Sequence, residues 1–143
     1  MATAESCTGG MVAGRIVSIA GSSAYFQGGV VAYANAVKAD MLGVPRVILD
    51  NPGAVSEACA RAMAEGARLR LGAAIAVSTT GIAGPEGGTA RKPVGLVYLG
   101  VATERGTTVE EHHFAGDRAA VIAAATERAL VLLVEAVEAE LEA

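Results

Sequence analysis

Segments with the patterns of strands and of helices alternate along the chain, and this alternation most constrains the fold. Alternation of this kind is typical of a sheet that carries helices on both faces. We predict an α/β fold with three α/β/α layers and a mixed, mostly parallel sheet, formed as a single domain over residues 1–143. The predicted strands are residues 1–4, 29–33, 73–80, 94–103 and 107–114, of which the last two form a hairpin across Arg105–Gly106.

Capping residues mark the starts of the predicted helices. Thr8, Asn35, Ser56 and Asp117 are the expected N-caps. The helices that they predict cover residues 9–18, 35–42, 57–71 and 118–142, whereas residues 47–51 are ambiguous between a helix and a strand.

Composition excludes several classes of function. The net charge is −4 with no basic patch, so nucleic acid is not an expected partner. Cys7 and Cys59 give neither a disulfide framework nor a metal spacing, which fits a reducing, cytoplasmic compartment. Residues 1–20 lack the pattern of a signal peptide, and charges interrupt the apolar residues 119–141, so we expect no membrane span. We also expect no metal and no cofactor.

Two glycine-rich segments are the candidate binding loops. Residues 5–10, Glu-Ser-Cys-Thr-Gly-Gly, join a strand to a helix whose free N–H groups could hold an anion. An ordinary capped helix explains this pattern equally well. Residues 81–93 contain four glycines and follow a predicted central strand, where ligands of α/β sheets gather. We favour a function for this loop, although it lacks the Gly-Lys-Ser/Thr ending of a phosphate-binding P-loop.

Other polar residues have no clear role from spacing alone. Ser23, Tyr33 and Lys38 could supply a nucleophile, a proton carrier and a base, but by composition alone a turn, a half-buried strand and a helix surface are the preferred explanations. Adjacent His112 and His113 point to opposite faces of a strand, which disfavours a shared metal site. Cys7 could be a thiol nucleophile at a helix start, but burial is the commoner outcome.

Taken together, the segments resemble the C-terminal domain of the CinA (competence/damage-inducible) family over nearly the whole chain. The resemblance rests on eight short motifs in a fixed order. They are residues 3–10 (TAESCTGG), 21–23 (GSS), 29–33 (GVVAY), Lys38 with 42–44 (LGV), 53–57 (GAVSE), 80–88 (TGIAGPEGG), 92–95 (KPVG) and 116–118 (GDR).

The resemblance implies a nicotinamide-nucleotide amidase. Such an enzyme converts nicotinamide mononucleotide to nicotinate mononucleotide and ammonia with a serine and a lysine. The positions that match the family's site are Ser6, Ser23, Tyr33, Lys38, Thr80 and Arg118. Family members usually carry a helix and a full first strand before the Glu-Ser-Cys-Thr-Gly-Gly segment, whereas Glu5 is here the fifth residue. We therefore expect one sheet face to be less covered.

These positions receive the following expected roles. Ser23 is the nucleophile with Lys38 as its base, Tyr33 assists proton transfer, and Ser6 is the rival nucleophile. The expected substrate-binding residues are Thr8, Gly9, Gly10, Thr80, Gly81, Gly84 and Arg118, with Arg118 and the glycine loops at the phosphate. The alternative is a nucleotide-binding module without catalysis. The Ala- and Val-rich helices also suggest a homo-oligomer.

Overall fold

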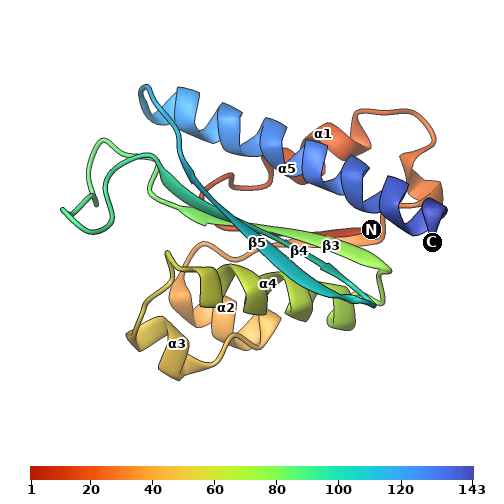
Figure 1. Ribbon diagram of the computed structural model, residues 1–143, viewed down its shortest axis with the longest axis horizontal. Helices are drawn as coiled ribbons and strands as arrows, with labels where there is room; N and C mark the ends of the chain where they lie inside the picture. The colour runs from red at the N-terminus through yellow and green to blue at the C-terminus, as the bar shows by residue number, and fades with distance from the viewer.

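The computed structural model describes residues 1–143 and contains one five-stranded sheet (Figure 1). The strands lie in the order β2-β1-β3-β4-β5, where β1, β2 and β3 run parallel and β4 runs antiparallel to both of its neighbours. The mixed sheet is therefore confirmed, and only β4 is reversed. The strand bounds are β1 Ala2–Glu5, β2 Gly28–Val31, β3 Ile75–Gly81, β4 Leu96–Thr103 and β5 Gly106–His113.

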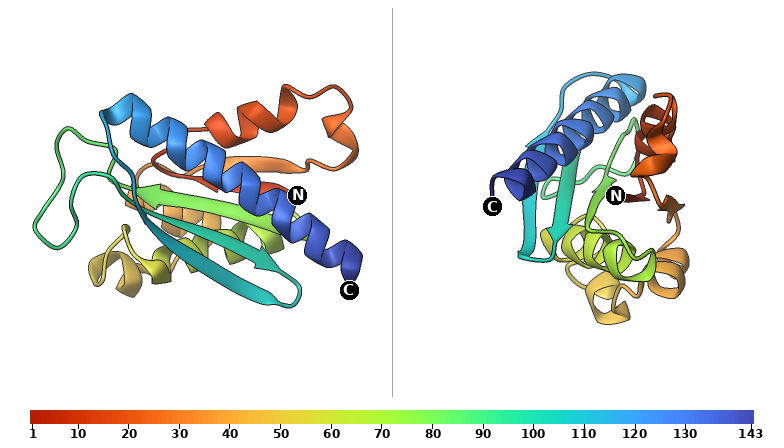
Figure 2. Two further views of the ribbon diagram at one scale, coloured as in Figure 1. Left: turned by 45° about the horizontal axis from the view of Figure 1, so that its top comes forward. Right: turned by 90° about the vertical axis from the view of Figure 1, so that its right-hand side faces the viewer.

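Helices cover both faces of the sheet, which confirms the three layers (Figures 1 and 2). The helices α1 (Met11–Val17) and α5 (Arg118–Glu142) lie on one face, and α2 (Asn35–Leu42), α3 (Arg46–Asp50) and α4 (Glu57–Arg70) lie on the other. Each face has its own apolar core. Val77 and Leu99 pack toward α5, whereas the small Ala4 and Ala76 pack toward Met63 of α4.

Small residues let α4 approach the sheet closely. A Cβ atom on Gly100 of β4 would lie 2.7 Å from the carbonyl oxygen of Ala60 in α4. The Ser78 hydroxyl on β3 donates to that same oxygen at 2.6 Å. The backbones of α4 and the sheet therefore pack in direct contact beneath β3 and β4.

Two of the four predicted N-caps are confirmed. Ser56 accepts a hydrogen bond from Cys59 N in α4, and Asp117 accepts one from Ala120 N in α5. The predictions for Thr8 and Asn35 are wrong, because the N-caps of α1 and α2 are Gly10 and Ala34, and neither has a side-chain cap.

Residues 47–51 are resolved in favour of a helix, since Arg46–Asp50 form α3. The predicted strand 29–33 ends earlier than expected, because β2 stops at Val31 and leaves Tyr33 in the following loop. No helix of the chain has the length and apolar character that crossing a membrane requires.

Candidate active site

A small cleft opens where the carboxyl ends of the three parallel strands meet. Ser6 directly follows β1, Tyr33 follows β2 and Thr80 lies near the end of β3. The carboxyl ends of parallel strands are the usual binding edge of an α/β sheet. The cleft has a volume of about 200 Å³ and is lined by Ser6, Cys7, Tyr33, Asn35, Lys38, Ala54, Val55, Thr80, Gly81, Ala83 and Arg118.

Lys38 and Ser6 form the chemical centre of this cleft. Lys38 is only 2% exposed, so the expectation of a surface lysine from spacing alone is wrong. Its Nζ lies 3.0 Å from Ser6 Oγ and donates to the carbonyl oxygen of Tyr33 at 2.8 Å. Burial lowers the pKa of Lys38 below its ordinary value of 10.5, because desolvation disfavours the charged ammonium. A lysine of this kind can accept a proton from a serine hydroxyl.

The two neighbouring strands hold the backbone at Ser6. Ser6 N donates to the carbonyl oxygen of Thr79 at 2.9 Å, and Ala32 N donates to that of Glu5 at 2.8 Å. Lys38 lies on the inward face of α2, which packs against α4. The strand ends position the serine and α2 positions the lysine, so the sheet brings together residues that are 32 positions apart.

Ser23 lies at the other end of the parallel strands. It belongs to η1 (Ser22–Ala24), which precedes β2, and it is exposed. The adjoining backbone contacts the start of β1, where Gln27 N donates to the carbonyl oxygen of Met1. Because β1 separates this position from Ser6 and Lys38, the geometry of the chain does not bring Ser23 to Lys38. The serine beside the lysine is Ser6.

The three predicted binding residues of the first glycine segment differ in whether their polar groups are free to contact a ligand. The Thr8 hydroxyl is buried and donates to Glu5 Oε1 at 2.6 Å, and it lies 2.7 Å from Thr79 Oγ1. Its side chain is therefore engaged within the protein. Gly9 and Gly10 adopt positive φ angles of 58° and 101°, which glycine accepts without strain. The N–H groups of Cys7, Thr8 and Gly10 donate to no acceptor within the chain.

Arg118 connects the second glycine segment to the mouth of the cleft. Its Nη1 donates to the carbonyl oxygen of Gly84 at 2.6 Å, and its Nη2 lies 3.3 Å from Tyr33 Oη. Thr80 donates its hydroxyl to the carbonyl oxygen of Ala54 at 2.8 Å and so holds the opposite wall. At Gly81 a Cβ atom would lie 2.7 Å from the carbonyl oxygen of Leu96, which explains the glycine there.

Residues to which the sequence assigned no role at the site also line the cleft. Asn35 was expected only as a helix cap, and Ala54 and Val55 belong to the motif at residues 53–57 without an expected contact to the substrate. Cys7 lines the cleft as well, but burial raises the pKa of its thiol to about 11, which disfavours a thiolate nucleophile. Cys59 is fully buried in the core, as its position on the helix predicts.

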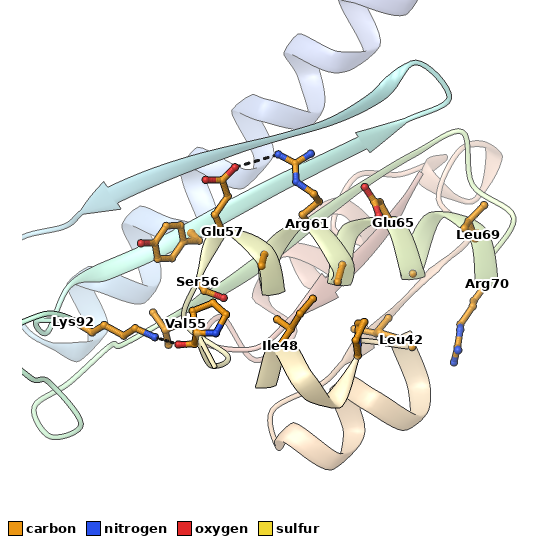
Figure 3. A pocket seen from close by; sticks show the side chains of 17 residues that line it. Leu42, Ile48, Val55, Ser56, Glu57, Arg61, Glu65, Leu69, Arg70 and Lys92 are labelled. Carbon is orange, nitrogen blue, oxygen red and sulfur yellow. Dashed lines mark hydrogen bonds and ion pairs between the residues drawn. The ribbon is translucent and has the colours of Figure 1, made fainter. Parts of the chain in front are cut away.

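A second, larger hollow of about 910 Å³ lies on the outer side of α4 (Figure 3). Its polar groups satisfy one another: Ser56 caps α4, Glu57 pairs with Arg61 at 3.2 Å, and Lys92 Nζ donates to the carbonyl oxygen of Pro52. None of these side chains forms a nucleophile–base pair. We therefore place the candidate active site in the smaller cleft, which shares only Val55 with this hollow.

The comparison with protein families gives a match to the CinA C-terminal domain over residues 1–137. A CinA-like protein of Geobacter sulfurreducens is 54% identical over 121 residues, which are 85% of this chain and 29% of that protein. A CinA-like protein of Anaeromyxobacter dehalogenans is 56% identical over 133 residues, or 93% of this chain and 33% of that protein. The chain thus spans about a third or less of the length of these relatives.

Solved structures of similar sequence share the fold. The competence/damage inducible protein CihA of Agrobacterium tumefaciens superposes with a TM-score of 0.91 at 46% identity, covering 94% of this chain and 82% of that one. The competence damage-inducible protein A (ComA) of Klebsiella pneumoniae gives 0.90 at 39% identity, with 94% and 83% covered. The family match, the sequence relatives and the shared fold agree, and the chain belongs to the CinA C-terminal domain family.

Proposed function

We propose that the chain hydrolyses the carboxamide of nicotinamide mononucleotide to nicotinate mononucleotide and ammonia, with Ser6 as the nucleophile and Lys38 as the base. The observation that carries the proposal is the 3.0 Å contact between Lys38 Nζ and Ser6 Oγ inside a buried cleft. Burial lowers the pKa of Lys38 and so raises the share of the neutral amine, which is the only form that can take a proton.

Acylation begins when neutral Lys38 removes the proton from Ser6 Oγ. The oxygen attacks the carboxamide carbon, a C–O bond forms, and the carbonyl electron pair moves onto the oxygen. The Lys38 ammonium then protonates the amide nitrogen as the C–N bond breaks, so that ammonia leaves and an ester on Ser6 remains. Tyr33 supports this step through its carbonyl oxygen, which holds Nζ in place at 2.8 Å.

Deacylation uses the same pair of residues in the reverse sense. Lys38 takes a proton from water as the water oxygen attacks the ester carbon. The Ser6 oxygen then leaves with the proton from Lys38, and the product carboxylic acid is released. Because Nζ has only two partners within the protein, Ser6 Oγ and the Tyr33 carbonyl, it retains capacity for a water or the leaving nitrogen.

Charge on the substrate has two candidate partners. The N–H groups of Cys7 and Thr8, which follow the nucleophile and have no acceptor in the chain, suit the developing oxyanion. Arg118 at the mouth of the cleft, together with the glycines at 81 and 84, suits the 5′-phosphate through a forked, charged contact. We propose these roles alongside the nucleophile assignment.

The test is ammonia release from nicotinamide mononucleotide by the purified chain and two variants. Ser6→Ala is expected to lose activity, whereas Ser23→Ala retains it, because only Ser6 contacts Lys38. Loss in Ser23→Ala with full activity in Ser6→Ala would reverse the assignment. Stabilisation of the wild-type chain by the mononucleotide without ammonia would favour a binding module instead.

We also propose a cytoplasmic homo-oligomer. The support for the compartment is that both cysteines are buried free thiols. The support for self-association is the number of exposed apolar side chains in α1, β2 and the segments that follow them: Met11, Val17, Ile19, Tyr25, Val31 and Tyr33. Light scattering coupled to gel filtration tests the assembly, and a strictly monomeric mass would exclude it.

A further inference from the structure

The helix α1, which follows the candidate nucleophile, lacks an ordinary cap. Its N-cap residue is Gly10, which has no side chain to accept from the free N–H groups of the first turn. The acceptor comes instead from outside the helix. Glu5 Oε1 accepts from Val12 N at 2.8 Å, and Glu5 Oε2 accepts from Ala13 N at 3.0 Å.

Glu5 performs this role from a fully buried position. It is 1% exposed, and burial of a carboxylate is costly unless hydrogen bonds replace the lost water. A third donor is the Thr8 hydroxyl, at 2.6 Å from Oε1. A Ser cap on the helix itself would accept from these amides without a buried carboxylate, as Ser56 does for α4. Helix capping alone therefore does not explain the use of Glu5.

The contacts of Glu5 close a ring around Ser6. Glu5 precedes Ser6 in the chain, and its carboxylate binds the loop on the far side of Ser6 through Thr8. Thr8 in turn contacts Thr79 on β3, whose carbonyl oxygen accepts from Ser6 N. The segment from Glu5 to Thr8 is thus held at both ends and against the neighbouring strand, and Ser6 lies in its middle.

We propose that Glu5 is a positioning residue, which, together with Thr8, holds Ser6 Oγ in the direction of Lys38 Nζ. The inference rests on the proposed function of Ser6 as a nucleophile. Glu5 acts on Ser6 through the loop and contacts neither the cleft nor Lys38. A displacement of about 1 Å in a reacting group can reduce the rate about 100-fold, so the loss of this carboxylate has a kinetic consequence.

Glu5→Gln is the sharpest single change. The side chain keeps its size, but its amide NH₂ replaces one carboxylate oxygen and then faces the N–H of Val12 or Ala13, which is also a donor. We expect kcat for ammonia release to fall about 10- to 100-fold with little change in KM. The pH midpoint of the rate should stay in place, because the pKa of Lys38 is lowered by its own burial and not by a contact with Glu5.

A second readout does not depend on the substrate. A fluorophosphonate probe forms a bond from Ser6 Oγ to phosphorus and releases fluoride, and intact-mass spectrometry follows the rate with Ser6→Ala as the blank. Thr8→Val and Thr8→Ser provide a second pair of variants if Glu5→Gln does not fold. Thr8→Val is expected to react about 10-fold more slowly than wild type, and Thr8→Ser, which keeps the hydroxyl, is expected to recover most of this loss.

Thr126→Val is the matched control for stability. Thr126 is also a buried threonine, but its hydroxyl donates to the Ile122 carbonyl within α5, away from Ser6. It should lower Tm without changing the labelling rate. If Glu5→Gln and Thr8→Val lower Tm yet label at the wild-type rate, the positioning role is overturned and Glu5 is only structural.

The outcomes separate the two proposals. Labelling of wild-type Ser6 without release of ammonia from the mononucleotide would reject the substrate but still leave the comparison of Glu5→Gln with wild type decisive. Wild-type protein that neither releases ammonia nor labels at Ser6 would overturn the proposed function and the positioning role together. The positioning role of Glu5 is supported only if labelling is slowed in both Glu5→Gln and Thr8→Val.

Discussion

The parallel half of the sheet and the antiparallel hairpin handle their polar groups in opposite ways. At the ends of β1 and β3, Glu5, Thr8 and Lys38 are buried, and other parts of the chain provide their partners. On the β4–β5 hairpin the polar groups pair across the surface. Tyr98 donates to Glu111 at 2.6 Å, and this bond helps to raise the pKa of Tyr98 to about 12.

This contrast between buried and surface-paired polar groups indicates which half of the sheet carries the candidate site. Polar groups that stay near water lose little when they lose a partner, whereas buried ones lose the full cost of their desolvation. A chain that retains buried polar groups on one side of its sheet does so at a cost in stability. The parallel half is thus the specialised part of this domain, and the hairpin is the support.

Among the variants that distinguish the two halves, Lys38→Met should have the largest effect on activity. We expect kcat for ammonia release to fall about 1,000-fold or more, because the proposed general base is removed. The free energy of unfolding should be unchanged or higher at neutral pH, since an apolar side chain of similar length replaces a buried amine. Steady-state kinetics and urea denaturation measure both. Lys92→Met, which alters a lysine outside the cleft, is the control, and equal loss in both variants would contradict the assignment.

Gly100→Ala tests the close packing of the hairpin strand β4 against α4. The new Cβ atom would lie 2.6 Å from Ser78 Oγ and 2.7 Å from the Ala60 carbonyl oxygen, so α4 must move. We expect a loss of about 1–3 kcal/mol in the free energy of unfolding, measured in urea. Gly14→Ala in α1 meets nothing within 4 Å and should gain about 0.5–1 kcal/mol, because alanine favours the helix. Equal effects in the two variants would mean that helix propensity, not close packing, governs both sites.

The pH dependence of the free energy of unfolding tests whether Lys38 is desolvated in the folded chain. Its pKa is lowered in the folded chain because burial disfavours the charge. Between that lowered value and 10.5 the unfolded chain binds a proton that the folded chain lacks, so the free energy of unfolding rises with pH in this window. Relative to Lys38→Met, the wild-type chain should gain stability as pH increases. Parallel curves for the two proteins would show that Lys38 is not desolvated.

Glu110→Gln on the hairpin should have the smallest effect. Arg128 binds both carboxylate oxygens at 2.8 Å and lowers the pKa of Glu110 to about 2. This contribution is present above pH 4.5 and is lost as pH falls through 2. Because both side chains are about one-third exposed, we expect less than about 1 kcal/mol near neutral pH and unchanged kcat. Thermal unfolding at pH 7 and pH 2 measures it, and a loss of activity would contradict the separation of the two halves.

Local patterns predicted most of the elements. Short apolar segments, and alternation at residues 107–114, located all five strands within a few residues, and the Ser56 and Asp117 caps marked the starts of α4 and α5 correctly. These signals are local, because a cap needs only the next turn and a strand needs only its own two faces. The Thr8 cap was wrong because Glu5, seven and eight residues before the amides that it binds, competes for the same role.

By itself, the sequence determined the layers, the glycine segments and the family resemblance, which depend on residues close together in the chain. Which serine contacts Lys38 depends on how the strands pair, and this pairing is visible only in the tertiary structure. The sequence favoured Ser23 over its rival Ser6, but the parallel pairing of β1 and β2 places Ser6 at the end where α2 begins and Ser23 at the other. The burial of Lys38 could not be predicted from the sequence either, because desolvation depends on packing from α2, α4 and the sheet together.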